Sequence, residues 1–284
     1  MRCLGNNIKT TVNNLTVSYN DEGPEEAQAI IFIHGFPFNM CMWEKQVEAL
    51  KDNYRVIAYD VRGHGDSDAG SVYFSIDLFA NDLIELMDKL ELDKAIICGL
   101  SMGGYIALNA IGKYPERFDA LILSDTQCIA DTPEIKVKRQ EAIETINENG
   151  VENYADGGLV NLFSPASFIN KKEEVAAVRK MIINTAKQSL CKTLMALSER
   201  KETCSKLLEI AVPVLIMVGQ EDKITPPAAS QLMHEKIKDS ILNIIADAGH
   251  MANMENPSVF NDHLKQFLNQ FVKKPVRLSA PVIE

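Results

Sequence analysis

Several features of other protein classes are missing from this 284-residue sequence. The longest apolar stretches, such as Ala29–Ile33, are far shorter than the roughly 20 residues that a membrane-spanning helix needs. The opening residues MRCLGNNIKT contain no apolar run of the kind found in signal peptides. No internal repeat or low-complexity tract is present either. We therefore expect a protein with no membrane partner.

An excess of positive charge is also missing. The chain carries 29 Lys and Arg against 39 Asp and Glu, which gives a formal net charge of -10. Proteins that bind phosphate backbones or anionic lipid without sequence preference need a basic surface. We therefore expect no nucleic-acid partner.

The six cysteines have none of the spacings typical of metal or redox motifs. Neither CxxC nor CxxH occurs among Cys3, Cys41, Cys98, Cys128, Cys191 and Cys204. Together with the missing signal peptide, this pattern predicts reduced thiols in a cytoplasmic protein. Cys98 lies inside a predicted strand and is interpreted as a small apolar core residue.

The remaining composition is that of a folded domain, with 46% hydrophobic and 24% charged residues. Residues 8–19 alternate around Asn13 and Asn14, which predicts an antiparallel hairpin. Short apolar runs bounded by Gly, Asp or Pro are typical of strands buried on both faces of a parallel sheet. Such runs occur at residues 29–33, 55–59, 95–98, 120–123, 214–218 and 241–245.

Helical patterns separate these strands. Apolar residues spaced three and four apart predict a helix from Ile76 to Leu90, and another helix runs from the end of the 95–98 strand to Tyr114. Thr225-Pro226 and Asn256-Pro257 are interpreted as N-cap and first-turn pairs of two late helices. This alternation of strands and helices predicts an α/β fold with a doubly wound, mostly parallel sheet.

One long interval interrupts the alternation. Residues 126–210 contain only helical patterns, divided at Gly157-Gly158 and Ser164-Pro165, and are too long for a crossover connection. We predict an inserted helical cap there, between core segments 1–125 and 211–272, with a tail at 273–284. Basic and acidic side chains are equal in number in this interval, so no electrostatic funnel is expected.

The strongest chemical signal is Gly99-Leu100-Ser101-Met102-Gly103, a G-x-S-x-G sequence between a predicted strand and a predicted helix. In this context a sharp turn presents the serine hydroxyl at the carboxyl edge of the sheet, and side chains in place of the glycines would collide with neighbouring elements. The sequence matches neither G-x-G-x-x-G nor a P-loop. Ser101 is therefore a candidate nucleophile.

A serine nucleophile requires a base, normally a histidine oriented by a carboxylate. His250 follows the 241–245 strand and Asp222 follows the 214–218 strand, so both belong to loops at the same edge as Ser101. Glu221 and Asp125 are alternative carboxylates.

These motifs, with His34-Gly35-Phe36-Pro37 and residues 60–67, resemble the α/β-hydrolase superfamily from about residue 15 to 270, except for most of the cap. Within it the chain is similar to small capped esterases, 3-oxoadipate enol-lactonases and cofactor-free haloperoxidases. The resemblance implies an eight-stranded sheet, Ser101 as nucleophile, His250 as general base and acid, and Asp222 as its orienting carboxylate. It also implies an oxyanion hole formed by the backbone N–H groups of Phe36 and Met102.

Other side chains allow more than one interpretation. His34 and His64 are expected to stabilise their own loops, and His234 and His263 to lie at the surface. The methionine-rich set near the predicted site, which includes Met251 as a substrate-pocket residue, either lines an acyl pocket or fills the core: Met40, Met42, Trp43, Met251 and Met254. Arg139, Arg179 and Arg200 are equal candidates for binding a substrate carboxylate.

The expected function is hydrolysis of a small carboxylic ester, thioester or lactone through an acyl-enzyme on Ser101, without metal or cofactor. A perhydrolase or haloperoxidase-like activity is one alternative. The other is a ligand-binding or receptor protein on the same fold, although a binder has no need of Ser101, Asp222 and His250 together.

Overall fold

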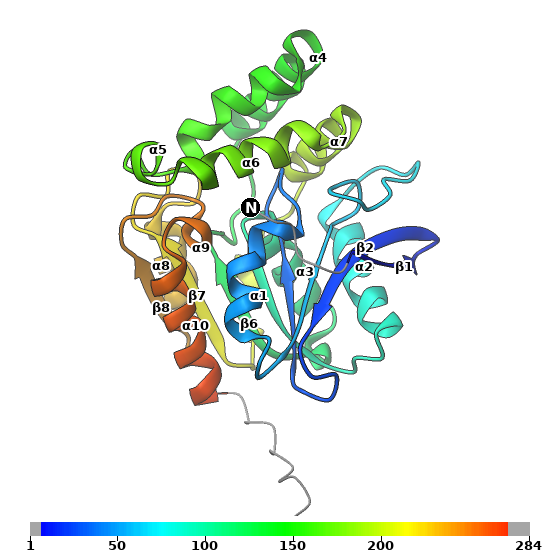
Figure 1. Cartoon of the computed structure of the whole chain (residues 1–284), viewed down its shortest axis with the longest axis vertical. Helices are drawn as coiled ribbons and strands as arrows, with labels where there is room; N and C mark the ends of the chain where they lie inside the picture. The colour runs from blue at the N-terminus through cyan, green and yellow to red at the C-terminus, as the bar shows by residue number, and fades with distance from the viewer. Residues whose placement is uncertain (1–6, 272–284) are drawn as a thin grey trace, which may run out of the picture.

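Eight strands form one mixed sheet in this computed structural model, which describes residues 7–271 (Figure 1). Their spatial order is β1-β2-β4-β3-β5-β6-β7-β8. The pairings of β1 with β2 and of β2 with β4 are antiparallel, and all later pairings are parallel. The predicted mostly parallel sheet is confirmed.

The strands match the predicted apolar runs closely. They are β1 (Ile8–Val12), β2 (Leu15–Glu22), β3 (Ala29–Ile33), β4 (Arg55–Tyr59), β5 (Ala95–Leu100), β6 (Phe118–Ser124), β7 (Val214–Gly219) and β8 (Ile241–Ile245). The α-helices of the core are α1 (Glu44–Leu50), α2 (Ile76–Lys89), α3 (Met102–Ile111), α8 (Pro227–Lys236), α9 (Ala252–Glu255) and α10 (Pro257–Phe271). The short 3₁₀ helices within the described residues are η1 (Met40–Trp43), η2 (Pro115–Arg117) and η3 (Cys204–Glu209).

Both faces of the sheet are covered, because side chains of a strand point alternately to opposite faces. On β3, Ile31 and Ile33 belong to the core cluster that includes residues of α2, α3 and α8. Ile30 and Phe32 belong to the cluster that includes residues of α1 and α10. All four are fully buried. This arrangement confirms the doubly wound fold.

Local signals explain several element boundaries. Asn13 and Asn14 both have positive φ, 47° and 62°, as the tight turn of the β1–β2 hairpin requires. The side chain of Ser75 caps α2 by accepting a hydrogen bond from the N–H of Leu78. Asn256 precedes Pro257 at the start of α10 as predicted.

Two predicted boundaries are wrong. Helix α8 begins at Pro227 with Pro226 as its N-cap residue, because Thr225 donates its hydrogen bonds to Asp222 instead. In the inserted interval Gly157 and Gly158 lie inside a helix, and the break falls at Gly150, whose φ of 87° is not helical. Glycine adopts that conformation without steric cost.

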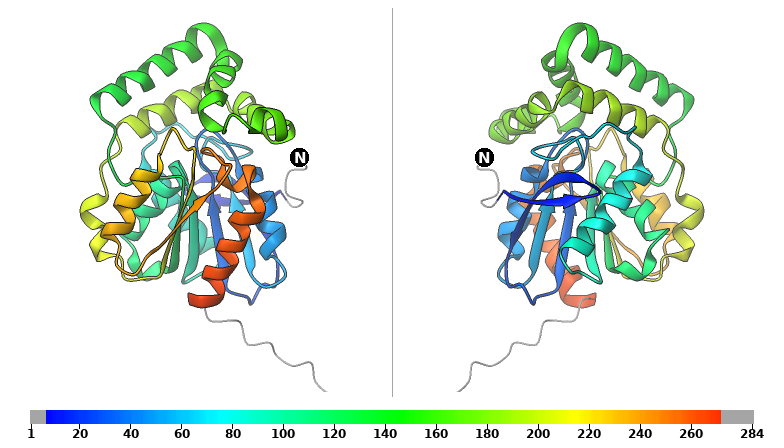
Figure 2. Two further views of the ribbon diagram at one scale, coloured as in Figure 1. Left: turned by 90° about the vertical axis from the view of Figure 1, so that its left-hand side faces the viewer. Right: turned by 90° about the vertical axis from the view of Figure 1, so that its right-hand side faces the viewer.

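The inserted helices are α4 (Pro133–Leu162), α5 (Ser167–Asn170), α6 (Lys172–Asn184) and α7 (Lys187–Ser198). They lie together above one end of the sheet in both side views, as a cap does (Figure 2). The domain limits at residues 125, 210 and 272 stay a prediction, and the predicted tail at 273–284 is outside the described residues.

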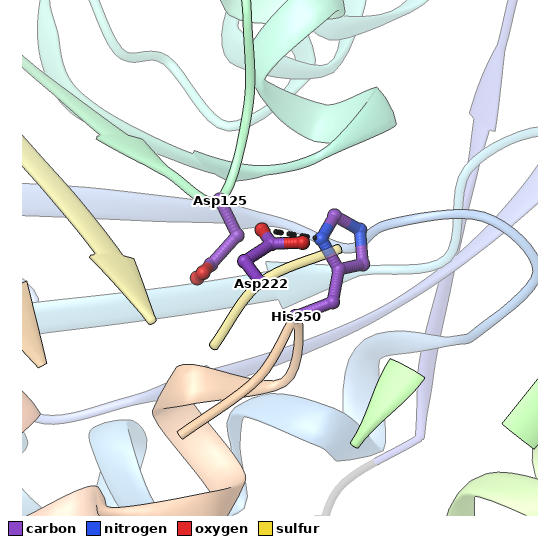
Figure 3. A group of neighbouring side chains, drawn as sticks. All are labelled: Asp125, Asp222 and His250. Atoms are coloured by element: carbon purple, nitrogen blue, oxygen red, sulfur yellow. Dashed lines mark hydrogen bonds and ion pairs between the residues drawn. The ribbon is translucent and has the colours of Figure 1, made fainter. Parts of the chain in front are cut away.

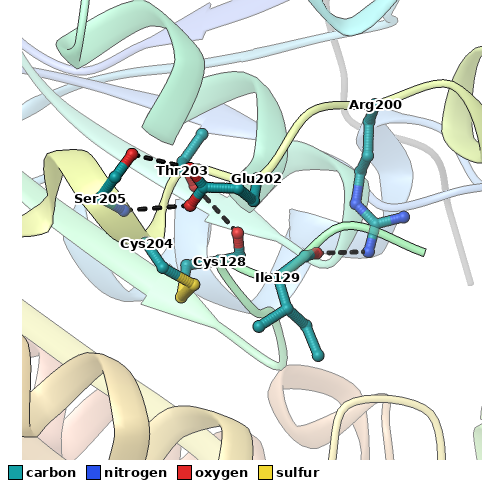
Figure 4. The surroundings of a disulfide bond; sticks show 7 residues. All are labelled: Cys128, Ile129, Arg200, Glu202, Thr203, Cys204 and Ser205. Carbon is teal, nitrogen blue, oxygen red and sulfur yellow. Dashed lines mark hydrogen bonds between the residues drawn. A yellow bond between two sulfur atoms is a disulfide. The ribbon is translucent and has the colours of Figure 1, made fainter. Parts of the chain in front are cut away.

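A disulfide joins the two chain segments that connect this cap to the core (Figure 4). Cys128 follows β6 and Cys204 begins η3, 76 residues later, so the bond closes a loop containing all four cap helices. The same segments are joined by hydrogen bonds from Thr203 N–H to Cys128 O, at 2.8 Å, and from the Arg200 guanidinium to Ile129 O, at 2.9 Å. The expectation that all cysteines are reduced thiols is therefore wrong.

The predicted cytoplasmic location rested on reduced thiols, and the disulfide removes that support because such bonds persist mainly in oxidising compartments. Cys98 is a free, fully buried thiol in β5, as interpreted from the sequence. Among residues 7–271, no helix is both long and apolar enough to span a bilayer.

We predict that the double variant Cys128→Ser/Cys204→Ser has a free energy of unfolding lower by about 2–4 kcal/mol, because the unfolded chain regains the freedom that the closed loop removes. Urea denaturation measures the change. Cys191→Ser is the matched control, since Cys191 is a free cysteine of the cap. Equal stability of the double variant and the wild type would contradict the prediction.

Candidate active site

Ser101 stands at the turn between β5 and α3, in a backbone conformation that few side chains adopt. Its φ is 53° and its ψ is -112°. The neighbouring strand holds this turn in place, since Ser101 N–H donates to Ser124 O at 2.9 Å and Thr126 Oγ1 donates to Ser101 O at 2.8 Å. Such strained residues occur preferentially at functional sites. The predicted sharp strand-to-helix turn is present.

The glycines two residues before and two after Ser101 are required by the closeness of the backbones. A Cβ on Gly99 would lie 2.2 Å from the carbonyl oxygen of Gly103, and a Cβ on Gly103 would lie 2.2 Å from that of Ile33. Both separations are far inside van der Waals contact. This is the steric reason that the G-x-S-x-G pattern predicts.

His250 and Asp222 form a buried pair. His250 Nδ1 lies 2.8 Å from Asp222 Oδ2, and the two side chains are 1% and 0% exposed. An N–H group at Nδ1 then donates a hydrogen bond to the carboxylate, and Nε2 is left unprotonated and able to accept a proton. His250 also lines the same cavity as Ser101. The structure thus brings the three predicted residues to one edge of the sheet.

Three further donors hold the Asp222 carboxylate in place. Its Oδ1 accepts from the N–H groups of Ile224 and Thr225, at 2.8 and 3.0 Å, and its Oδ2 accepts from Thr225 Oγ1 at 2.8 Å. Burial acts to raise the pKa of Asp222, but the charge of His250 and the hydrogen bonds from His250 and Thr225 lower it below its usual value. Asp222 is therefore an anion suited to orienting an imidazole.

The two alternative carboxylates are placed differently. Glu221 is exposed. Asp125 lies on the side of Asp222 that is away from His250, and Figure 3 shows that only Asp222 is bonded to His250. The oxygens of Asp125 accept hydrogen bonds from Ser124 Oγ and Gly219 N–H instead. Burial, together with the charge of Asp222, raises the pKa of Asp125 well above its usual value.

Asp125, Asp222 and His250 also have the donor types of a metal site. One donor atom from each lies within 4.8 Å of the others, and this is the only such cluster found in residues 7–271. However, Asp222 and His250 face each other through a hydrogen bond, and both oxygens of Asp125 already accept N–H or O–H donors. The arrangement fits a hydrogen-bonded network better than metal coordination.

A cavity of about 500 Å³ lies between these residues and the cap. Phe36 and Met102, the predicted oxyanion-hole residues, line it together with Ser101 and His250. Met102 is the first residue of α3, where N–H groups have no acceptor within the helix. The cap contributes the opposite wall, with Ile135, Lys138, Arg139, Ala142, Tyr154, Gly158, Asn161, Leu162, Ile182, Leu194 and Leu197.

The methionine-rich set near the site fills the core. Met251, predicted to line the substrate pocket, is fully buried and is not among the residues that line this cavity. The whole set belongs to the core cluster on the α1 and α10 face of the sheet: Met40, Met42, Trp43, Met251 and Met254. Of the two interpretations that the sequence allowed, the packing supports core filling.

His34 and His64 are structural residues of the loops beside the site. His34 Nε2 accepts a hydrogen bond from Val61 N–H at 2.9 Å, while its Nδ1 lies 2.8 Å from Gly35 O. His64 Nδ1 lies 3.1 Å from Arg62 O. Burial lowers the pKa of His34 to about 3 and that of His64 to about 4, so both are neutral and hold their loops by hydrogen bonding. His234 and His263, predicted to lie at the surface, are half-buried.

The three candidate arginines have different surroundings. Arg139, on α4, lines the cavity and bonds to Asp131. Arg200 is buried beneath the cavity, where it bonds to Asp131 and stacks on the ring of Tyr105 at 4.2 Å. Arg179 pairs with Asp156 and does not line the cavity. Of the three, only Arg139 lines the cavity.

Four residues at or beside the site have no signal in the sequence. Lys138 and Lys223 line the cavity, and Asp131 is the single acidic side chain among the described lining residues. The cap is neutral as a whole, yet Lys138 and Arg139 both lie on the wall that it contributes to the cavity. Glu255, nearly fully buried, accepts a hydrogen bond from Gly249, the residue before His250. Only a knowledge of tertiary contacts identifies such residues.

Comparisons with known proteins agree with this architecture. A family model described as alpha/beta hydrolase fold matches residues 28–257. The chain is 32% identical to 3-oxoadipate enol-lactonase 1 of Acinetobacter baylyi, over 91% of this chain and 93% of that protein. It is 32% identical to a putative non-heme chloroperoxidase of a Synechocystis species, over 90% of this chain and 96% of that protein.

Among solved structures, the chain is similar to a thermophilic esterase from Thermogutta terrifontis with malate bound. The TM-score is 0.89 at 31% identity, and the match covers 95% of this chain and 100% of the esterase. The family match spans most of the sheet, the turn at Ser101 and the loop of residues 246–251 between β8 and α9, which is named the His250 loop below. The protein belongs to the α/β-hydrolase family.

Proposed function

We propose that this protein is a serine hydrolase that cleaves a small carboxylic ester, thioester or lactone through an acyl-enzyme on Ser101. The observation that carries the proposal is the common cavity. A serine on a strained turn and a histidine hydrogen-bonded to a buried carboxylate line the same 500 Å³ space. Esterase and enol-lactonase relatives at about 30% identity support the same reaction class.

The mechanism follows from the roles that these groups are able to take. Ser101 Oγ attacks the substrate carbonyl while His250 Nε2 accepts its proton, and Asp222 stabilises the imidazolium that forms. The imidazolium then protonates the leaving oxygen or sulfur. Water attacks the acyl-enzyme in the second half of the reaction, with His250 again as the base, and Ser101 is released.

The oxyanion that forms in each half requires donors that are already oriented. The backbone N–H of Met102, at the beginning of α3, and that of Phe36, in the loop after β3, are the proposed pair. Removing one such donor typically raises the barrier by about 3 kcal/mol. The position of both residues on the cavity wall beside Ser101 supports these roles.

We further propose that the substrate carries a negative charge, such as a carboxylate remote from the scissile bond. Lys138, Arg139 and Lys223 line the cavity, and the one acidic lining residue, Asp131, is bonded to both Arg139 and Arg200. Burial acts to raise the pKa of Asp131, but the two arginines lower it below its usual value. A cationic wall in a protein of net charge -10 favours an anionic ligand.

A second candidate is a perhydrolase or haloperoxidase-like activity, in which peroxide replaces water as the acceptor. The identity with a putative non-heme chloroperoxidase favours it. A receptor without turnover is the non-enzymatic alternative. Assays with and without peroxide separate the perhydrolase activity from simple hydrolysis. The absence of any turnover would favour the receptor.

We predict that Ser101→Ala abolishes hydrolysis of short p-nitrophenyl esters, with a loss in kcat on the order of 10⁶-fold, because no other group supplies the nucleophile. Release of p-nitrophenol measures the rate. Ser198→Ala, on the cap helix α7, serves as the control with unchanged turnover. Turnover that survives Ser101→Ala would overturn the proposed function.

We predict that Arg139→Met lowers kcat/KM for an anionic ester by about 10- to 10²-fold, the usual effect of losing a charge-assisted hydrogen bond. The substrates are a p-nitrophenyl monoester of a dicarboxylic acid and the neutral ester of the same chain length. The neutral ester should change little, and Arg179→Met should affect neither substrate. An equal loss on both esters in Arg139→Met would contradict the anion-binding role.

A further inference from the structure

Glu255 is a buried carboxylate that joins the His250 loop to the cap. It ends helix α9 and is 2% exposed. Its Oε1 accepts a hydrogen bond from Gly249 N–H at 2.7 Å. Its Oε2 accepts two others, from Ser164 N–H at 2.8 Å and from Ser167 Oγ at 2.6 Å. Residues 162–167, which connect α4 to α5, are named the cap corner below.

The backbone of the His250 loop also contacts the cap corner directly. His250 N–H donates to Leu162 O at 2.9 Å. A Cβ on Gly249 would lie 2.7 Å from Ser164 N and 2.8 Å from Phe163 C, so the two backbones are packed too closely for any side chain at position 249. The cap corner therefore holds the residue before His250 and His250 itself.

The burial of Glu255 makes this contact costly to separate. None of the ion pairs found in residues 7–271 includes Glu255, so three N–H and O–H donors are the partners that compensate its burial. A buried carboxylate that loses its donors without reaching water is strongly destabilised. Moving the cap corner away from the His250 loop would break bonds on one side of this carboxylate. The two segments are thus expected to move as one unit.

We propose that Glu255 is a positioning residue that fixes the backbone at His250 against the cap corner, so that the imidazole meets Ser101 only while this corner is seated on the core. The proposal rests on the proposed hydrolase function. Asp222 sets the orientation of the imidazole ring through Nδ1, whereas Glu255 sets the position of the main chain that carries the ring. The cap is then part of the catalytic assembly as well as the roof of the cavity.

The test is Glu255→Gln, which keeps the shape of the side chain but leaves one oxygen where two are needed. The amide oxygen is able to accept from Gly249 or from the two serines, not from both sides. We expect kcat for a neutral p-nitrophenyl ester, normalised to active sites titrated with a fluorophosphonate, to fall by about 10- to 10²-fold, since small misplacements of catalytic groups have effects of this size. KM should stay within about threefold, because the lining of the cavity is unchanged.

Two further variants make the result decisive. Ser167→Ala removes the 2.6 Å bond to Glu255, together with the 3.1 Å contact between the hydroxyls of Ser167 and Ser164, and leaves the other two bonds to Glu255 in place. It should lower kcat by about threefold, the effect of one hydrogen bond. If Glu255→Gln does not fold, this variant alone decides. Glu148→Gln, on the exposed surface of the cap helix α4, is the matched control with unchanged kcat.

Unchanged kcat in a folded Glu255→Gln variant, or in Ser167→Ala if it alone folds, would overturn the positioning role. The rate of Ser101 phosphonylation gives a second readout, which should fall in parallel with kcat because it also depends on His250. A general loss of stability with an unchanged kcat for each titrated site would show that Glu255 is only structural. Failure of the wild type to react with esters or with the fluorophosphonate would instead refute the proposed function itself.

Discussion

The hydrogen bond between Asp222 and His250 is the interaction on which the site depends. It joins two loops at the carboxyl edge of the sheet, and it is buried with almost no exposure of either side chain. Burial alone would favour the neutral acid, but the partners of Asp222 lower its pKa and keep it charged. A histidine held in one tautomer by an anion is able to accept a proton on the opposite nitrogen. His250 lines the same cavity as Ser101.

The sheet and the cap supply this interaction with its surroundings. Parallel pairing of β5, β7 and β8 with their neighbours brings the loops of Ser101, Asp222 and His250 to one edge, as expected for α/β sheets. The cap closes that edge, and its connections to the core are joined by the Cys128–Cys204 disulfide. Glu255 adds a second attachment, between the cap corner and the His250 loop. The cap is thus linked to the core at its base and at the site itself.

Much of this arrangement follows from local sequence. Apolar runs identified the strands because strands buried on both faces are apolar throughout, and Gly99 and Gly103 identified the serine turn because no Cβ fits there. The Cys128–Cys204 pair, the cationic wall around Arg139 and the role of Glu255 were not identified. Each depends on side chains from segments far apart in the chain, and no local periodicity records which of them meet. The helix break lies at Gly150 and not at the predicted Gly157-Gly158, because a helix in contact with the core tolerates these two glycines.

The most direct test of the central claim is to react the folded protein with a fluorophosphonate and to locate the adduct by peptide mass spectrometry. If Ser101 is activated by the buried Asp222–His250 pair, the reagent should bind in a one-to-one ratio, and the adduct should lie on Ser101 alone. An adduct on another residue of the cavity, or no reaction at Ser101 under conditions in which the protein stays folded, would contradict the account.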